Sequence, residues 1–189
     1  HAGKRRLKLK CFELVAKATL ERKQIRIQHF NRQTGVTVER IISPQQMVHY
    51  RDNWYVDAWC HLRNKLLNFS VDAITHCDIL EGAAKEVSQK DIKVIMQSGY
   101  GIFGGEANHW AKLKFSAVRA RWVQAEEWHP EQKSTINKDG TYTLEFPYSD
   151  ERELLGDILR FGADVEVLAP KSLRASVMNA ATQALALYK

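Results

Sequence analysis

The segment that organises the first half of the chain reads Asn53-Trp54-Tyr55-Val56-Asp57-Ala58-Trp59-Cys60-His61-Leu62-Arg63. Its even-numbered residues are apolar, whereas its odd-numbered residues mix aromatic rings with polar groups. This alternation is typical of a strand with one buried face. The mixed face, which carries Tyr55 and His61, would suit either stacking against bases or packing against a neighbouring domain, and both interpretations stay open.

Shorter strands are predicted on both sides of this segment. Residues 25–27 and 36–42 alternate in polarity across a turn-rich stretch, and residues 69–73 alternate downstream. Four or five short antiparallel strands are too few for a large sandwich. The sequence therefore predicts a small, strongly curved SH3/Sm-like β-barrel.

The second half of the chain shows a clearer order of elements. A strand at residues 111–115 is followed by a helix, a hairpin at Gly140, a second helix and a last strand. A capping box starting at Asp150 begins the second helix, and Gly162 ends it. This order is typical of a ferredoxin-like α/β sandwich.

The predicted fold class is therefore α+β, with two architectures in succession. Trp54 and Trp122 fall on apolar faces by periodicity and are expected in the two cores. The predicted divisions are a basic connector and helix at 1–23, the barrel at 24–82, a linker and helix at 83–105, and the sandwich at 106–189.

The net charge of +6 is concentrated at the start of the chain. Residues 1–23 hold eight of the 28 lysines and arginines but only two of the 22 acidic residues, so the remainder is neutral. Such an arm is typical either of a segment that touches phosphates or an acidic partner, or of a solvated helix leading in from another domain. Because the chain starts at His1 without a methionine, we expect either a tag remnant or a fragment of a longer protein.

Composition and motifs argue against several classes of protein. No apolar run approaches the roughly 20 residues of a membrane span and no secretory signal is visible, so a cytoplasmic protein is expected. The three cysteines have no framework spacing and are expected to be free thiols. Ser43 lacks the setting of a nucleophile, and the Cys-His pairs match no zinc pattern. We predict no catalytic residue, no metal and no cofactor.

An ordered set of motifs resembles the WYL domain, which is named for a Trp-Tyr-Leu tripeptide whose third letter is Val56 here. In the first half the matching residues are Arg40-x-x-Ser43-Pro44, the 53–63 segment and Phe69-Ser70-Val71-Asp72-Ala73-Ile74. The second half resembles the extension that accompanies this domain, at residues 100–103, 120–123, 127–130, 147–149, 153–159 and 164–170.

The resemblance implies a bacterial transcription regulator. In such proteins an N-terminal winged helix-turn-helix, absent from this fragment, binds operator DNA. The WYL barrel senses an effector, for which nucleotides or single-stranded nucleic acid are proposed, and the extension helps to build a homodimer. The alternative is an interaction module with no small ligand, whose barrel face docks onto the partner subunit.

A ligand site is predicted around two arginines near strand ends, Arg40 and Arg63, because a guanidinium there can fork onto a phosphate. Ser43 and His61 would supply hydrogen bonds, and two rings would shape or stack on the ligand. The full predicted site is Arg40, Ser43, Tyr55, His61, Arg63 and Phe69.

This chain departs from the family pattern at three positions. Family members often carry arginines where it has Leu67 and Ala73, and a tyrosine where it has His29. Two lost arginines would weaken phosphate binding by about 1–3 kcal/mol each if both made charge-assisted contacts. The pocket is therefore expected either to prefer a less charged ligand or to have diverged from the ligand site of the family.

Overall fold

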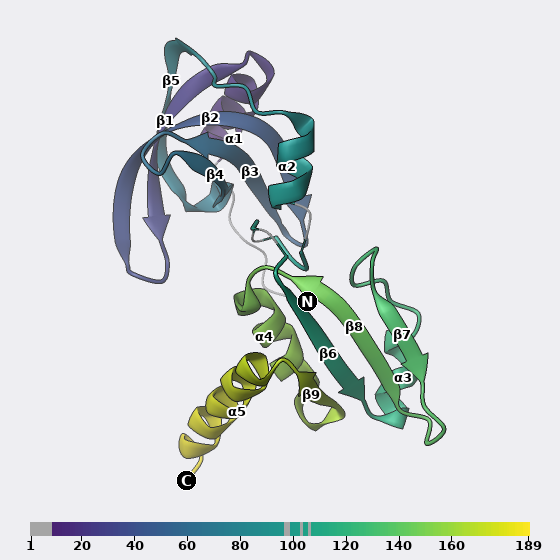
Figure 1. The fold of residues 1–189 in the computed structure, drawn as a ribbon. Helices are drawn as coiled ribbons and strands as arrows, with labels where there is room; N and C mark the ends of the chain where they lie inside the picture. Colours follow the sequence, from purple (N-terminus) through teal and green to yellow (C-terminus); the bar gives the residue numbers. More distant parts are fainter. Residues whose placement is uncertain (1–8, 97–98, 103, 106) are drawn as a thin grey trace. The chain divides into compact units, whose positions relative to one another are not determined.

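The computed structural model describes residues 9–96, 99–102, 104–105 and 107–189. These residues divide into two compact units, His1–Lys93 and Val94–Lys189, each with its own hydrophobic core (Figure 1). The first eight residues of the predicted connector lie outside the described residues, as do Phe103 and Glu106 of the second unit.

The first unit contains an antiparallel sheet of five strands in the order β4-β3-β2-β1-β5. Its elements are α1 (Leu9–Leu20), β1 (Lys23–Asn31), β2 (Val36–Tyr50), β3 (Asn53–Cys60), β4 (Lys65–Ser70), the 3-10 turn η1 (Val71–Ala73) and β5 (Ile74–Ala83). Within the described part of the chain no ladder joins β4 to β5, so the barrel there is not closed, and the SH3/Sm-like assignment stays a prediction.

The way β4 connects to β5 explains why the sheet is curved. These strands are the two edges of the sheet, yet only the three residues of η1 separate them along the chain. Three residues span roughly 10 Å at most, so the sheet must curl until its edges approach each other. Val71 and Ala73 of η1 are buried, and Val71 belongs to the core of the first unit.

The alternation predicted for the 53–63 segment is confirmed as far as Cys60, whereas Leu62 is 60% exposed in the turn that follows. Val56 and Ala58 of β3 are fully buried in the core of the first unit. We call this side of the sheet the inner face and the opposite side the outer face. Helix α1 covers the inner face with Val15 and Ala18, so the helix predicted within the connector contributes to this core.

Strand β2 continues beyond the end expected from its apolar residues. Its first half pairs with β1 and its second half with β3. The register shifts between Pro44 and Gln46, which marks a β-bulge. A bulge tolerates the missing N–H of proline, and it lets the 15-residue strand bend around the core.

The second unit contains a four-stranded antiparallel sheet in the order β7-β8-β6-β9. Helix α2 (Gln89–Met96) spans the boundary between the units. The remaining elements are β6 (His109–Phe115), α3 (Ala117–Val123), β7 (Lys133–Ile136), β8 (Tyr142–Tyr148), α4 (Glu151–Phe161), the 3-10 turn η2 (Gly162–Asp164), β9 (Val165–Ala169) and α5 (Lys171–Ala186). The α+β class is confirmed. The order of elements from β6 to β9 is the predicted one, and the ferredoxin-like assignment stays a prediction.

Local signals in the second half of the sequence agree well with the structure. Asp150 caps α4 by accepting the backbone N–H of Arg152 at 2.9 Å, and Gly162 ends that helix with a positive φ of 57°. The interpretation of Trp122 was wrong, because its side chain is 57% exposed. Helix α3 has only seven residues, and Ala120 and Val123 form its buried side.

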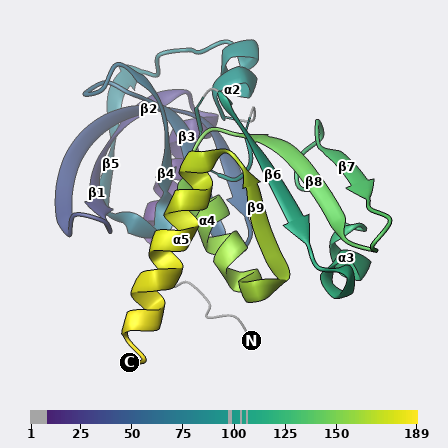
Figure 2. The ribbon, with the colours of Figure 1, turned by 60° about the horizontal axis from the view of Figure 1, so that its bottom comes forward.

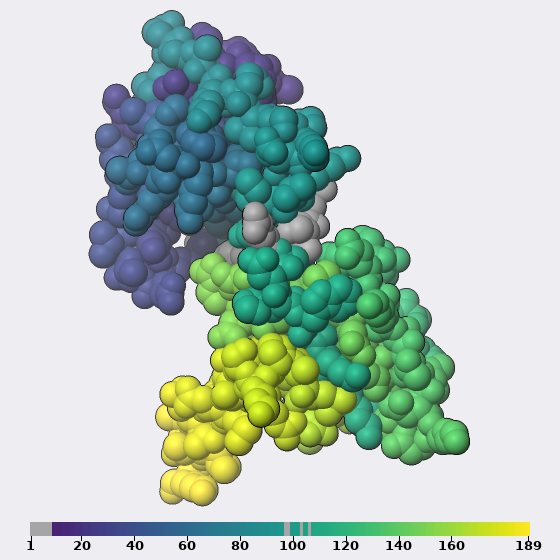
Figure 3. Space-filling view, in the orientation of Figure 1, coloured from purple at the N-terminus to yellow at the C-terminus, as the bar shows by residue number. Residues whose placement is uncertain are grey.

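The last helix is only partly covered by its own unit. Leu173 near its start is fully buried, whereas its C-terminal turns extend beyond the sheet of the second unit (Figures 2 and 3). Large exposed apolar side chains at this end are Met178, Leu185, Leu187 and Tyr188. No helix within the described ranges has the length and apolar character needed to cross a membrane.

Candidate ligand site

Four of the six residues predicted to form one site lie on two opposite faces of the first sheet, and His61 and Arg63 lie in the turn after β3. Arg40 pairs with Ile27, a core residue, and therefore lies on the inner face. Phe69 is 3% exposed and also belongs to the inner core. Ser43 pairs with Trp59 on the outer face, where Tyr55 lies as well. The structure therefore joins the predicted residues into two groups rather than one.

Arg40 is half-buried at the edge of the inner core. Its Nη1 donates to the Sγ of Cys60 at a distance of 3.7 Å, which is a weak contact. Among the described residues, no carboxylate lies within ion-pair distance of its guanidinium. Arg40 is thus a partly desolvated cation without a close counter-charge from this part of the chain.

His29 lies beside Arg40 as a diagonal cross-strand neighbour, because Ile27 pairs with Arg40 and His29 pairs with Val38. Its imidazole meets the Phe69 ring edge to face, with 5.3 Å between centroids. Its Nε2 is buried and has no hydrogen-bond partner among the described residues. Burial lowers the pKa of His29, and the charges of Arg40 and Arg32 lower it further.

Asp72 holds the next cation, Arg32, in place. The Nη2 of Arg32 donates to Oδ2 of Asp72 at 2.8 Å, and the Asp72 side chain is only 6% exposed. Burial alone would raise the pKa of Asp72, but hydrogen bonds from Ser70, Arg32 and Asn53 outweigh it and hold the pKa below its ordinary value. We call Arg32, Arg40 and His29 the basic cluster.

Replacing Asp72 with asparagine is expected to lower the free energy of unfolding at pH 7 by about 1–3 kcal/mol, because buried donors lose a charged acceptor. Since the folded pKa lies below the unfolded value of 3.8, this stabilisation is present above about pH 4 and is lost as the pH falls through the folded pKa. Urea unfolding at pH 7, 5 and 3 measures the difference in free energy of unfolding between the wild type and Asp72→Asn. The exposed turn residue Asp52, changed to asparagine, is the control. A difference that grows on acidification would contradict this assignment.

The outer-face group is tied to the segment that follows β5. Ser43 is fully buried, and its Oγ accepts the backbone N–H of Lys85 at 2.8 Å. The same Oγ lies 2.9 Å from Nε2 of His61. The ammonium of Lys85 in turn lies 3.3 Å from the centroid of the Trp59 ring. Because Ser43 is buried and Lys85 covers Trp59, this group anchors a chain segment rather than forming an open platform.

Arg63 is the exposed member of the predicted set, and Tyr55 is half-buried like Arg40 and His61. Tyr55 is half-buried between Val48 and Ser70 of the neighbouring strands. Arg63 is exposed in the β3–β4 turn, and its backbone N–H donates to the carbonyl of Cys60 at 3.2 Å. Arg40 contacts the side chain of the same cysteine, so both arginines are neighbours of Cys60.

Asp57 is a buried carboxyl group that the sequence analysis did not single out. It lies on the outer face and is 3% exposed. Gln46 and Asn68, its partners in the adjacent strands, donate to it at 2.8 and 2.7 Å. Burial raises the pKa of Asp57, and the two amide hydrogen bonds only partly oppose this effect. This triplet joins three strands and leaves little of the carboxylate open to a ligand.

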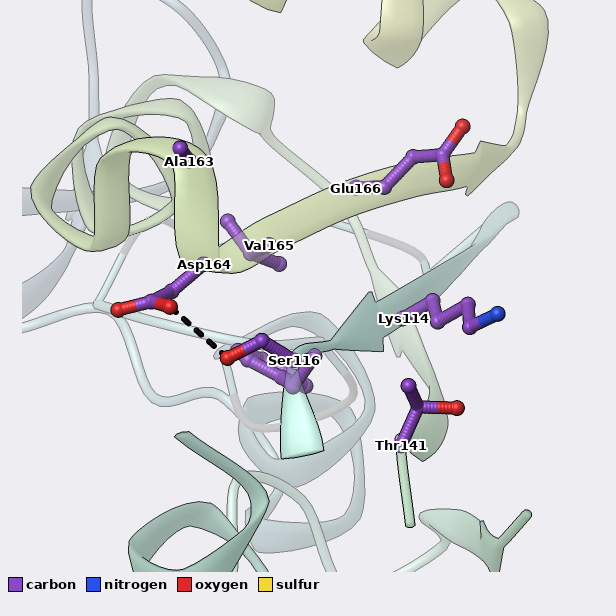
Figure 4. Close-up of a pocket in the computed structure, with 8 residues that line it drawn as sticks. Lys114, Ser116, Thr141, Ala163, Asp164, Val165 and Glu166 are labelled. Atoms are coloured by element: carbon purple, nitrogen blue, oxygen red, sulfur yellow. Dashed lines mark hydrogen bonds between the residues drawn. The ribbon is translucent and has the colours of Figure 1, made fainter. Parts of the chain in front are cut away.

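A pocket of about 180 Å³ opens in the second unit, between the end of β6 and the start of β9 (Figure 4). Its polar side chains already have partners. Ser116 donates to Asp164 at 2.8 Å, Lys114 pairs with Asp139, and Glu166 pairs with Arg174. The charges that line it are therefore neutralised within the protein, and it is a weaker ligand site than the basic cluster.

The other reactive side chains in the described part of the chain are metal-ligating groups and cysteines. No group of three or more metal-ligating side chains occurs there. Cys11, Cys60 and Cys77 are free and buried, as expected. Burial, together with the nearby Cys11, raises the pKa of Cys77 to about 12, so its thiolate is scarce near neutral pH.

Comparison with known domain families identifies the class of each unit. Residues 10–79 match the WYL domain, and residues 107–185 match the WCX domain. The chain therefore contains a WYL domain followed by a WCX domain. The basic cluster lies within the WYL match, and the pocket of Figure 4 lies within the WCX match.

Two curated relatives match most of this chain. The chain is 25% identical over 176 residues to Protein PafC of Mycobacterium tuberculosis, a match covering 93% of this chain and 54% of that protein. It is 24% identical over 177 residues to Protein PafC of Mycobacterium leprae, covering 93% and 52%. The chain thus spans about half the length of the curated relatives that it matches.

Two solved structures are similar to the chain. A CRISPR Cas-related protein shows 13% identity and a TM-score of 0.53, with 95% of this chain and 51% of that chain covered, which is a likeness of fold. Proteasome accessory factor B/C (PafBC) of Arthrobacter aurescens shows 21% identity and a TM-score of 0.44, with 93% and 27% covered.

Proposed function

We propose that this chain is the effector-sensing region of a bacterial DNA-binding transcription regulator. In this proposal the WYL domain binds a nucleotide or a single-stranded nucleic acid through its phosphates. The operator is bound by a further domain outside this sequence. The WYL and WCX matches support the proposal, because the resemblance to WYL regulators implies effector binding.

The single observation that carries the proposal is the environment of the Arg40 guanidinium. A half-buried guanidinium that meets only a thiol among the described residues keeps N–H donors open to solvent, where an anion can bind them. Phosphate oxygens suit a guanidinium fork in geometry and charge. Arg63, exposed in the turn beside Cys60, adds a second cation for the same ligand.

The proposed mechanism is a shift between conformations. A ligand that binds one conformation better than another changes their populations by its difference in affinity. In a dimeric regulator, such a shift would alter the spacing of the DNA-binding domains.

The salt dependence of binding tests the proposal. We expect a short fluorescent single-stranded oligonucleotide to bind at 50 mM salt, with log affinity falling by roughly 0.7 per neutralised phosphate for each unit of log salt concentration. Fluorescence polarisation at 50–200 mM salt measures this slope. Absence of binding at 50 mM salt would overturn the proposal.

A second candidate function is a dimerisation module with no small ligand. The observation that favours it is the exposed apolar end of α5, because helices usually gain their stability by packing an apolar face. In that case the protein binds no oligonucleotide, while sedimentation shows a concentration-dependent mass.

A further inference from the structure

The surroundings of His29 disfavour a positive charge on its imidazole while the site is empty. Burial removes water from the ring, and Arg40 and Arg32 add positive potential. The charge of Asp72 raises the pKa of His29, but this carboxylate already accepts a hydrogen bond from Arg32. These effects lower the pKa of His29, so the free protein holds this ring neutral near pH 7.

The groups packed around His29 come from several elements. Arg40 faces it from β2, and the ring of Phe69 packs against it from β4. Arg32 follows the end of β1 and is held by Asp72 of η1. On the β5 side, His29 pairs with the apolar Ile74. The charged groups next to His29 are thus two cations and one carboxylate that is already engaged.

We propose that phosphate binding at Arg40 is coupled to protonation of His29, so that the WYL domain takes up a proton together with its ligand. An anion held by Arg40 offsets the positive potential that Arg40 imposes on the imidazole. The Nε2 atom of His29 is buried and has no partner among the described residues, so the interior screens this change in potential only weakly. The proposal rests on the proposed function and adds a property to it, since the sensor responds more strongly as the pH falls.

The direction of the pH effect follows from linkage. Binding raises the pKa of His29 from its lowered value, so affinity increases as the pH falls between the bound and free pKa values. One linked proton limits the change to about tenfold per pH unit. Above the bound pKa, the affinity becomes independent of pH because neither state is protonated.

Isothermal titration calorimetry with unlabelled oligodeoxythymidylate tests the coupling, because its phosphodiesters and thymines do not titrate between pH 6 and 8. Titrations at pH 6, 7 and 8, in two non-phosphate buffers of different ionisation enthalpy, give affinity and proton uptake together. We expect uptake by the wild type and an affinity that rises severalfold per pH unit of acidification. We expect His29→Gln to bind at pH 8 with neither effect, and His76→Gln, an exposed histidine of β5, to keep both.

The outcomes separate the two proposals. Binding without proton uptake by the wild type would overturn the role of His29 and leave the ligand site standing, and this result does not depend on the folding of any variant. An unchanged pH dependence in His29→Gln would also overturn it. Failure of the wild type to bind at any pH would overturn the proposed function itself.

Discussion

Simultaneous replacement of Arg40 and Arg63 with alanine should reduce oligonucleotide affinity by at least about a hundredfold. Each charge-assisted hydrogen bond to phosphate contributes about 1.5–3 kcal/mol, so the loss of two exceeds the 2.7 kcal/mol of two decades. Fluorescence polarisation at 50 mM salt measures the effect. The fold should persist, because Arg63 is exposed and Arg40 loses only its weak contact with Cys60.

The matched control for this experiment is Arg26→Ala. Arg26 lies on β1, one residue before the core residue Ile27, and therefore on the outer face of the same sheet. It approaches Glu39 at 3.8 Å and is 46% exposed, so it already has a counter-charge. Its removal should leave binding within about threefold, as expected for an exposed ion pair. A control that lost half of the binding free energy lost by the double variant would show that only net charge matters, because the double variant removes two charges and the control one.

Replacing Phe115 with alanine should destabilise the second unit by about 3–5 kcal/mol. The Phe115 ring is fully buried and lies 5.4 Å from Phe161 and 5.8 Å from Trp128, measured between centroids. The cavity left by alanine would therefore remove contacts with α4 and with the loop after α3. Loss of this much free energy is enough to unfold many small domains.

Hydrogen exchange followed by mass spectrometry shows which unit responds to Phe115→Ala. We expect amides of β6, β8 and β9 to lose protection while those of β1–β3 keep theirs, because each unit has its own core. Val118→Ala, at a 58% exposed position of α3, should change protection little. Loss of protection in both units together would show that they unfold as one cooperative body.

Local sequence patterns predicted elements more successfully than they predicted the site. Asp150 and Gly162 act on their immediate neighbours, so the limits of α4 could be read from a few residues. The division of residues 53–63 into two faces follows from the geometry of any strand. Trp122 was misplaced because helical periodicity over a short helix does not show which of its sides is buried.

The site depended on which strands become neighbours. Arg40 and Ser43 are three residues apart in one strand and therefore point to opposite faces, although the motif that contains both suggested a common pocket. His29 was noted only as a departure from the family pattern, yet its alternation with Ile25 and Ile27 already indicated the inner face. Arg32 carried no signal and Asp72 was noted only within the WYL motif, since their contact joins residues 40 positions apart.

The order of residues in this chain was sufficient for the α+β class, for the succession of elements in the second unit, and for the WYL resemblance that the domain matches confirm. These properties depend on periodicity, caps and turns, which act over a few neighbouring residues. Tertiary structure alone decided that the first sheet stays open, that Ser43 is buried, and that Arg40 lies next to His29 with no carboxylate partner among the described residues. Those outcomes depend on strand register and burial, which arise only when distant segments pack together.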